Sequence, residues 1–252
     1  NLYRDLALGS AFDGGEISEG ADYFSHGVSI GAPPDPFSRA GQVWNLPPYS
    51  PLALSDAGYA PMRAVLAANM RHAAALRIDH ILGFARQFWV PRGAEGRHGA
   101  YVNFPADDLI AITAIESHHQ RCLIVGEDLG TIPDGLREKL AAANILSYRV
   151  LWFEREGAGF KRPEQYPSLA LACLASHDLP TFKGWRAGRD IAVERELGLL
   201  SDAAAAARDE HRKAEIALLD QAVGVKHASG ADAAIAVHGF VASSPSQVML
   251  VQ

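Results

Sequence analysis

Apolar runs short enough for strands alternate along the chain with longer segments in which apolar residues recur at helical spacing. This alternation predicts an α/β protein with a mainly parallel sheet of about six strands. Strands are expected at residues 2–8, 76–80, 122–130, 148–153, 172–176 and 247–251. Helices are expected at residues 57–75, 107–119, 133–143 and 232–241, and residues 190–228 are expected to be helical in at least two segments around Ser201.

Residues 10–54 interrupt this alternation, because glycines and prolines cluster there and no period is visible. A long irregular segment inside a domain is uncommon and is often a lid or a binding loop. A small satellite core beneath the loop is an equally good interpretation. We find no internal repeat and no low-complexity linker, so we expect a single domain, residues 1–252, with an inserted loop region at 10–54.

Composition narrows the class of protein and of partner. Hydrophobic residues make up 48% and charged residues 21% of the chain, which is ordinary for a globular protein. The net charge of −6 gives no electrostatic reason to expect nucleic acid or an anionic membrane as a partner. No apolar run approaches the roughly 18 residues of a membrane span. Cys122 and Cys173 are expected to be buried thiols, which points to a cytoplasmic protein.

The most informative stretch joins the helix expected at 57–75 to the next strand. It carries Arg77 and Asp79, which in a strand point to the same side. A neighbouring guanidinium favours an ionised carboxylate, and an ionised carboxylate at a strand end is what a nucleophile requires. A buried Arg–Asp pair that closes a layer of a barrel explains these residues equally well.

Two further acids, Glu127 and Asp178, also stand near the ends of expected strands. In a β/α barrel, strand ends converge on the face that carries the active site. Glu127 follows an apolar strand, so burial is expected to raise its pKa and keep it protonated. A charged nucleophile paired with a neutral acid is the requirement of retaining glycoside chemistry. Binding of a divalent metal is the alternative, but no pair of acids has a recognised ligand spacing.

Several segments, taken together and in order, resemble the motifs of bacterial 4-α-glucanotransferases (amylomaltases, glycoside hydrolase family 77). The joint order of these segments is highly specific, whereas no single one would be. The segments are Tyr3–Ala7, Gly31–Asp35 with the loop to Trp44, Arg77–His80, Val125–Gly130, Tyr148–Phe153 and Ser176–Thr181.

The resemblance implies a (β/α)8 barrel and transfer of a 1,4-α-glucan segment from one maltooligosaccharide to another. It implies Asp79 as nucleophile, Glu127 as general acid/base and Asp178 as the third acid, which binds the donor sugar. No cofactor is implied, because protonation alone activates the leaving group.

The resemblance also implies substrate-binding roles for four residues: Arg77, His177, Asp35 and Trp44. Arg77 positions the nucleophile, and His177 contacts hydroxyls at the donor site. Asp35 and Trp44 fall in the loop that closes over the acceptor side, so residues 10–54 are expected to form the acceptor-side wall of the cleft. Such a loop favours transfer over hydrolysis by keeping water from the glycosyl-enzyme.

The sequence departs from the family pattern in its extent. Family members are longer: this chain starts at Asn1, near the third barrel strand, and stops at Gln252, before the family's extreme C-terminus. We therefore expect a fragment, an incomplete barrel of about strands 3 to 8. Open strand edges would favour self-association or pairing with the missing part. Two alternatives to a transferase stay open: a retaining α-glucan hydrolase of the α-amylase-like group, and an inactive piece that only binds glucan.

Overall fold

The six predicted strands are present in the computed structural model, which describes residues 2–35, 38–225 and 230–251. The chain divides within the fourth of these strands into two compact parts, residues 1–147 (unit 1) and 148–252 (unit 2). The alternation of strands and helices is that of part of a (β/α) barrel. The six strands are β1 (Tyr3–Leu6), β4 (Ala75–Ile78), β7 (Leu123–Gly126), β8 (Leu146–Val150), β11 (Ala170–Cys173) and β12 (Val248–Leu250).

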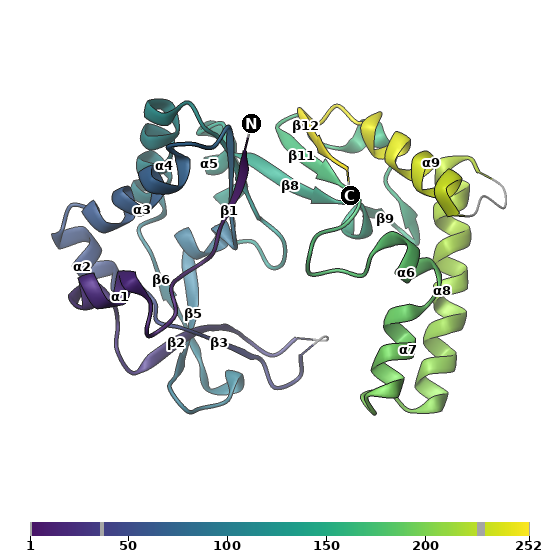
Figure 1. The fold of residues 1–252 in the computed structure, drawn as a ribbon, viewed down its shortest axis with the longest axis horizontal. Coiled ribbons are helices and arrows are strands. Elements are labelled where there is room, and N and C mark those ends of the chain that lie inside the picture. Colours follow the sequence, from purple (N-terminus) through teal and green to yellow (C-terminus); the bar gives the residue numbers. More distant parts are fainter. Residues whose placement is uncertain (1, 36–37, 226–229, 252) are drawn as a thin grey trace. The chain divides into compact units, whose positions relative to one another are not determined.

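In unit 1 the parallel strands lie in the order β1-β4-β7, followed by the start of β8. The helices of this unit are α3 (Ala60–Met70), α4 (Ala106–Gln120) and α5 (Leu136–Ala142). Helix α3 packs on β1, β4 and α4 (Figure 1), and their apolar faces form one buried core. The carboxyl ends of β4 and β7 therefore lie next to each other, with Ile78 paired to Gly126.

A second, antiparallel sheet corrects the prediction that residues 10–54 are irregular. This region holds helices α1 (Gly15–Gly20) and α2 (Pro51–Asp56) and the strands β2 (Val28–Ala32) and β3 (Gln42–Leu46). The strands join β5 (Arg86–Pro91) and β6 (Ala100–Asn103) in the order β3-β2-β5-β6. Their period is hard to see because β2 and β3 are short and a segment with three prolines, residues 33–41, separates them. Phe37, an aromatic of the predicted loop, lies outside the described residues.

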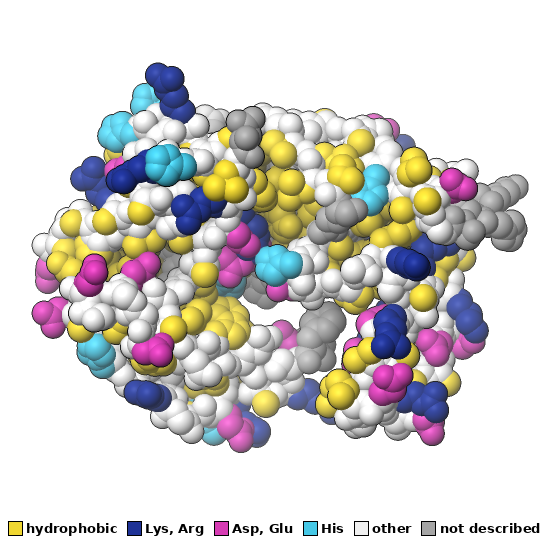
Figure 2. All heavy atoms as spheres, viewed as in Figure 1, with side chains coloured by type: hydrophobic (Ala, Val, Ile, Leu, Met, Phe, Trp, Pro, Cys, Tyr) yellow, Lys and Arg dark blue, Asp and Glu magenta, His cyan; other side chains and the backbone are white. Residues whose placement is uncertain are grey.

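In unit 2, β8 continues beside β11, and β11 pairs in parallel with β12. The helices that follow β11 are α6 (Phe182–Arg186), α7 (Arg189–Glu196), α8 (Asp202–Val223) and α9 (Gly230–Ala242). The predicted helical segment 190–228 is thus two helices, and its last residues, 226–228, lie outside the described part. Ser201 caps α8 by accepting a hydrogen bond from the Ala204 amide. Figure 2 shows the interleaved positive and negative side chains of α7 and α8.

The remaining elements are short. The helix predicted at 57–75 is reduced to α3, because a left-handed Tyr59 precedes it and a turn follows Met70. Cys122 and Cys173 are buried thiols, as predicted. Within the described residues, no helix combines the length and apolarity that a membrane crossing needs. The short elements are η1 (Ala21–Tyr23), η2 (Ile81–Phe84), η3 (Gly96–His98), η4 (Leu151–Phe153), η5 (Pro163–Gln165), β9 (Arg155–Glu156) and β10 (Gly159–Phe160).

Candidate active site

The predicted Arg77–Asp79 pair is present at the carboxyl end of β4. Asp79 comes directly after the strand, and its amide donates to the Leu6 carbonyl of β1 at 3.0 Å. The Arg77 side chain is buried, and its Nη2 lies 2.8 Å from Asp79 Oδ1. Its Nη1 donates to Asp5 Oδ1 at 2.7 Å, from the position directly opposite on β1. One guanidinium therefore fixes two carboxylates on adjacent strands.

This arrangement keeps Arg77 charged. Burial disfavours the guanidinium cation, but the hydrogen bond to Asp5 and the negative charges of Asp79, Asp5 and Glu127 leave the pKa of Arg77 above its ordinary value. A permanent positive charge thus stands beside the Asp79 carboxylate. An aspartate inside an expected strand predicts a buried, satisfied carboxylate at Asp5; the side chain is paired but 44% exposed. The sequence does not reveal its partner, because only the strand register brings Arg77 opposite it.

Glu127 comes directly after β7, beside the residues that follow β4. Its Oε2 accepts the His80 amide at 2.9 Å and its Oε1 accepts the Leu129 amide at 2.8 Å. His80 is the residue after Asp79, so the residue that contacts Glu127 is the chain neighbour of the other predicted catalytic acid. Glu127 and Asp79 therefore stand at the same edge of the sheet, as strand-end placement predicts.

The protonation of Glu127 is set mainly by burial. Burial raises the pKa of the Glu127 carboxyl, and the negative charge of Asp79 acts in the same direction. The Leu129 and His80 amides and the Arg77 charge act in the opposite direction and do not cancel the increase. The neutral acid is consequently favoured more than in an ordinary glutamate, as the sequence predicts.

Gly126 allows this close approach of β7 to η2. A Cβ at position 126 would lie 2.7 Å from Ile81 Cδ1, which no ordinary contact permits. The backbone of Glu127 is held by two further bonds: its amide donates to the Ile78 carbonyl at 2.9 Å, and its carbonyl accepts the Ile81 amide at 3.0 Å. The glycine before the acid is therefore a packing requirement of the site.

His80 connects the acids to the predicted loop aromatic Trp44. It has a left-handed backbone with φ of 45°, which directs its amide at Glu127. Its ring lies edge-on to Trp44 of β3, with 5.5 Å between ring centroids. Burial lowers the pKa of the His80 imidazole, and the charge of Asp79 opposes this only in part. The neutral form of the His80 ring is thus favoured, and this ring places Trp44 next to the residue that follows Asp79.

A cavity of about 320 Å³ opens next to these groups in unit 1. Asp79, His80 and Asp5 contribute to its wall, together with Tyr49 and Glu16. Its size is at the lower end of the roughly 300–1,000 Å³ of ligand pockets. The described residues contain no group of three or more His, Cys, Asp or Glu side chains arranged to hold a metal.

The other two predicted donor-site residues belong to unit 2. Asp178 and His177 lie beyond the end of β11, and both side chains are about two-thirds exposed. His177 Nε2 lies 3.5 Å from Asp178 Oδ1, and the Asp178 amide donates to Ser176 Oγ at 3.3 Å. The structure therefore brings Asp178 and His177 together, and brings Arg77, Asp79, Glu127 and Trp44 together in unit 1.

Asp35 lies in the turn after β2. Its carboxylate accepts the Ser38 amide at 2.5 Å, and its own amide donates to the Ser38 carbonyl at 3.0 Å. These bonds close the turn on itself. A contact of Asp35 with a substrate stays a prediction.

Comparison with known proteins identifies the family. The profile of a family described as 4-alpha-glucanotransferase, glycoside hydrolase family 77, matches residues 1–252. The chain belongs to this family. A family 77 relative, the 4-alpha-glucanotransferase of Haemophilus influenzae, is 44% identical over 200 residues, which cover 79% of this chain and 29% of that protein. That of Mycobacterium bovis is 36% identical over 262 residues, which cover 99% of this chain and 36% of that protein.

Two solved structures of amylomaltases have a fold similar to that of this chain. An amylomaltase from Corynebacterium glutamicum matches with a TM-score of 0.90 and 33% identity, over 98% of this chain and 37% of that one. An amylomaltase from Streptococcus agalactiae, solved in complex with acarbose, matches with a TM-score of 0.78 at 18% identity and supports the fold alone. The chain spans about a third of the length of the relatives it matches.

Proposed function

We propose that the protein carrying this chain is a 4-α-glucanotransferase that moves 1,4-α-glucan segments between maltooligosaccharides by a retaining double displacement. The observation that carries the proposal is the position of His80, which follows Asp79 in the chain and contacts Glu127. Its amide holds the Glu127 carboxyl, and the preceding residue, Asp79, is paired with Arg77. A charged carboxylate and a buried carboxyl group thus adjoin at one sheet edge, as the chemistry requires.

In the first step, the Glu127 proton passes to the glycosidic oxygen while an Asp79 oxygen bonds to the anomeric carbon. The bond to the leaving glucan breaks, and a glycosyl ester on Asp79 remains. In the second step, ionised Glu127 takes the proton of an acceptor hydroxyl. That oxygen bonds to the anomeric carbon and the ester bond breaks, which restores both carboxyl groups. Arg77 holds Asp79 in position for both steps.

The remaining residues are given roles through the family. We infer that Asp178 and His177 bind hydroxyls of the donor sugar, and that Asp35 and Trp44 serve the acceptor side. Residues 10–54 then form the acceptor-side wall of a catalytic core made by residues 1–252. The contact of Trp44 with His80 supports a position near the reacting groups. The buried thiols of Cys122 and Cys173 support a cytoplasmic location.

Incubation of the protein with maltotriose tests the activity. A transferase is expected to release glucose and form longer maltodextrins, with a constant number of reducing ends. A steady increase in reducing ends would instead identify a hydrolase. Binding of maltotriose without turnover would identify an inactive glucan-binding protein.

Two variants separate the roles of the acids. Asp79→Asn is expected to abolish turnover of every substrate, because the amide cannot form the ester. Glu127→Gln should slow maltotriose turnover by about 10²- to 10⁴-fold. With α-maltosyl fluoride, whose leaving group needs no proton, Glu127→Gln should still release fluoride and Asp79→Asn should not.

The matched control is Asp107→Asn, the same change at a largely exposed carboxylate of α4 in unit 1. It should retain parent turnover of both substrates. Parent-level maltotriose turnover by Asp79→Asn, or equal fluoride release by the two site variants, would contradict the assignment.

A further inference from the structure

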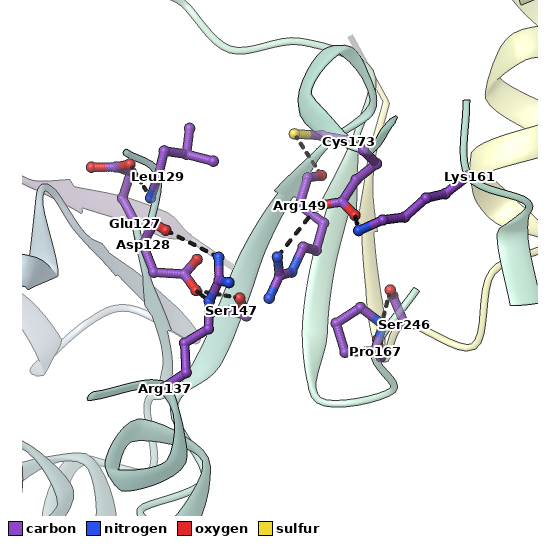
Figure 3. Close-up of polar contacts among 11 residues, drawn as sticks. Glu127, Asp128, Leu129, Arg137, Ser147, Arg149, Lys161, Pro167, Cys173 and Ser246 are labelled. Carbon is purple, nitrogen blue, oxygen red and sulfur yellow. Dashed lines mark hydrogen bonds and ion pairs between the residues drawn. The ribbon is translucent and has the colours of Figure 1, made fainter. Parts of the chain in front are cut away.

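Asp128 is a buried carboxylate that the proposed mechanism does not use. It follows Glu127, and its side chain is 1% exposed. Its Oδ2 accepts Arg137 Nε of α5 at 2.9 Å and Ser147 Oγ of β8 at 2.6 Å (Figure 3). These three residues, named the Asp128 cluster here, connect the segment after β7 to the next helix and the next strand.

The two consecutive acids point in opposite directions. In Figure 3 the Glu127 carboxyl lies beside Leu129, whereas the Asp128 carboxyl faces Arg137 and Ser147. The Leu129 amide that holds Glu127 belongs to the irregular segment 128–130, called the turn here because it bends at Gly130, whose φ of 95° is left-handed. The position of that amide therefore depends on what fixes Asp128.

We propose that Asp128 is a positioning residue: with Arg137 and Ser147 it fixes the turn whose Leu129 amide holds the Glu127 carboxyl. This inference rests on the proposed role of Glu127 as the acid/base. Strand β7 ends at Gly126, so the sheet ladder does not extend to the turn. Beyond the end of β7, the contacts of Asp128 with Arg137 and Ser147 hold this part of the chain in place. A carboxyl group that shifts by about 1 Å loses on the order of 10²-fold in rate.

A purely structural role is the competing explanation, because a buried ion pair that loses one partner always destabilises a fold. The two explanations differ in what happens to the ionisation of Glu127. The groups facing its carboxyl are Arg77, Asp79, His80 and the Leu129 amide. Displacement of the Leu129 amide removes a contact that favours the ionised form, so the pKa of Glu127 should increase. A structural role alone lowers stability and leaves the Leu129 amide in place, so that loss of the Asp128 charge acts only to lower the pKa of Glu127.

The test is the pH dependence of maltotriose turnover by Asp128→Asn, which keeps the shape of the side chain and removes its charge. We expect kcat to decrease by about 10- to 100-fold, KM to change by less than about twofold, and the alkaline limb to move to higher pH. Ser147→Ala removes one of the contacts of Asp128. It should also lower kcat and move the alkaline limb to higher pH, in each case by less than Asp128→Asn.

Glu154→Gln in unit 2 is the matched control. Glu154 is a buried carboxylate held by Arg149 at 3.3 Å and Lys161 at 2.7 Å. This variant should lower the melting temperature and leave the alkaline limb where it is. An alkaline limb that moves as far in Glu154→Gln as in Asp128→Asn would overturn the proposal. So would parent kcat and an unmoved limb in folded Asp128→Asn.

Amide hydrogen exchange at Leu129 gives a second readout that needs no activity. Exchange should be faster in Asp128→Asn than in the parent and unchanged in Glu154→Gln, and equal protection in parent and Asp128→Asn would overturn the proposal. The proposed function fails separately: if Glu127→Gln retains parent turnover, Glu127 is not the acid/base. Leu129 exchange would still report whether Asp128 fixes the turn.

Discussion

At the scale of single residues, the protonation of Glu127 decides the pH range of the reaction. The first step needs the protonated acid, and burial raises the pKa of Glu127 above the ordinary 4.5. The protonated fraction falls as the pH increases through this raised pKa. We therefore expect kcat/KM for maltotriose to decline on the alkaline side, with a limb above 4.5.

The raised pKa of Glu127 also makes the stability of the fold depend on pH. Because the folded state holds this proton more tightly than the unfolded state, Glu127 contributes to the free energy of unfolding at low pH. That contribution is lost as the pH rises from 4.5 through the raised pKa.

Measurement of kcat/KM for maltotriose across the pH range checks the predicted alkaline decline. An alkaline limb at or below the ordinary value would contradict it.

A second residue-scale prediction concerns Asp5. Asp5 holds one arm of the Arg77 fork, and the other arm holds Asp79. Asp5→Asn should lower kcat by about tenfold, which corresponds to ~1.4 kcal/mol of activation free energy. Arg77→Lys should lower it further, because a single ammonium cannot reproduce the planar fork.

Steady-state kinetics on maltotriose measures both variants. Asp107→Asn, the same change at a largely exposed aspartate of α4 in unit 1, serves as the control for Asp5→Asn and should keep parent kcat. An Asp5→Asn variant as active as the parent would show that Arg77 needs no second carboxylate.

The sequence predicts the roles of Asp79 and Glu127 better than the contacts that support them. An acid at a strand end is visible in the chain, because strand ends follow from apolar runs. The Asp5–Arg77 contact depends on the register of β1 against β4, and the Leu129 and His80 amides depend on local backbone angles. Register and a left-handed residue are tertiary outcomes that hydrophobic patterning does not encode.

At the scale of elements, the approach of β2 to β3 determines where Trp44 stands. A Cβ at Gly31 would lie 2.1 Å from the Gln42 carbonyl oxygen, at the irregularity where the register shifts. Gly31→Ala should therefore displace β3, destabilise the fold by about 1–3 kcal/mol and weaken the contact of Trp44 with His80. Trp44→Ala should lower the ratio of transfer to hydrolysis, and Gly31→Ala should change this ratio in the same direction.

Product analysis with maltotriose and excess glucose acceptor gives this ratio, and thermal unfolding gives the stability. Gly15→Ala is the control, because a Cβ there meets no atom within 4 Å. It should leave both quantities unchanged. An unchanged ratio in Trp44→Ala would count against an acceptor-side role for this sheet.

The same sheet explains why residues 10–54 were predicted as irregular. Strand β2 alternates only over Val28–Ala32, and its glycine at 31 removes one side chain from the pattern. Its partner β5 lies far along the chain, so the pairing that stabilises β2 is non-local. By contrast, β7 reads as a strand from its apolar run alone, because both of its faces are covered.

At the scale of the whole molecule, the residues to which we assign roles on the same glucan belong to two compact units. Asp79 and Glu127 belong to unit 1, and Asp178 and His177 to unit 2. If one glucan occupies one site, its binding should protect backbone amides in both units. We expect this in the Asp79→Asn protein, which should bind maltotriose without turning it over.

Hydrogen exchange followed by mass spectrometry is the measurement. With maltotriose at about 100 times its Kd, a single binding site adds about 2.7 kcal/mol to the free energy of unfolding. Exchange should slow at residues 79–80 and 127–129 and also at 176–178. Addition of Asp178→Ala should weaken binding and reduce protection in both units together, since a shared ligand couples them. Protection confined to unit 1, with unit 2 unaffected by maltotriose, would show that Asp178 and His177 do not bind the sugar that Asp79 attacks.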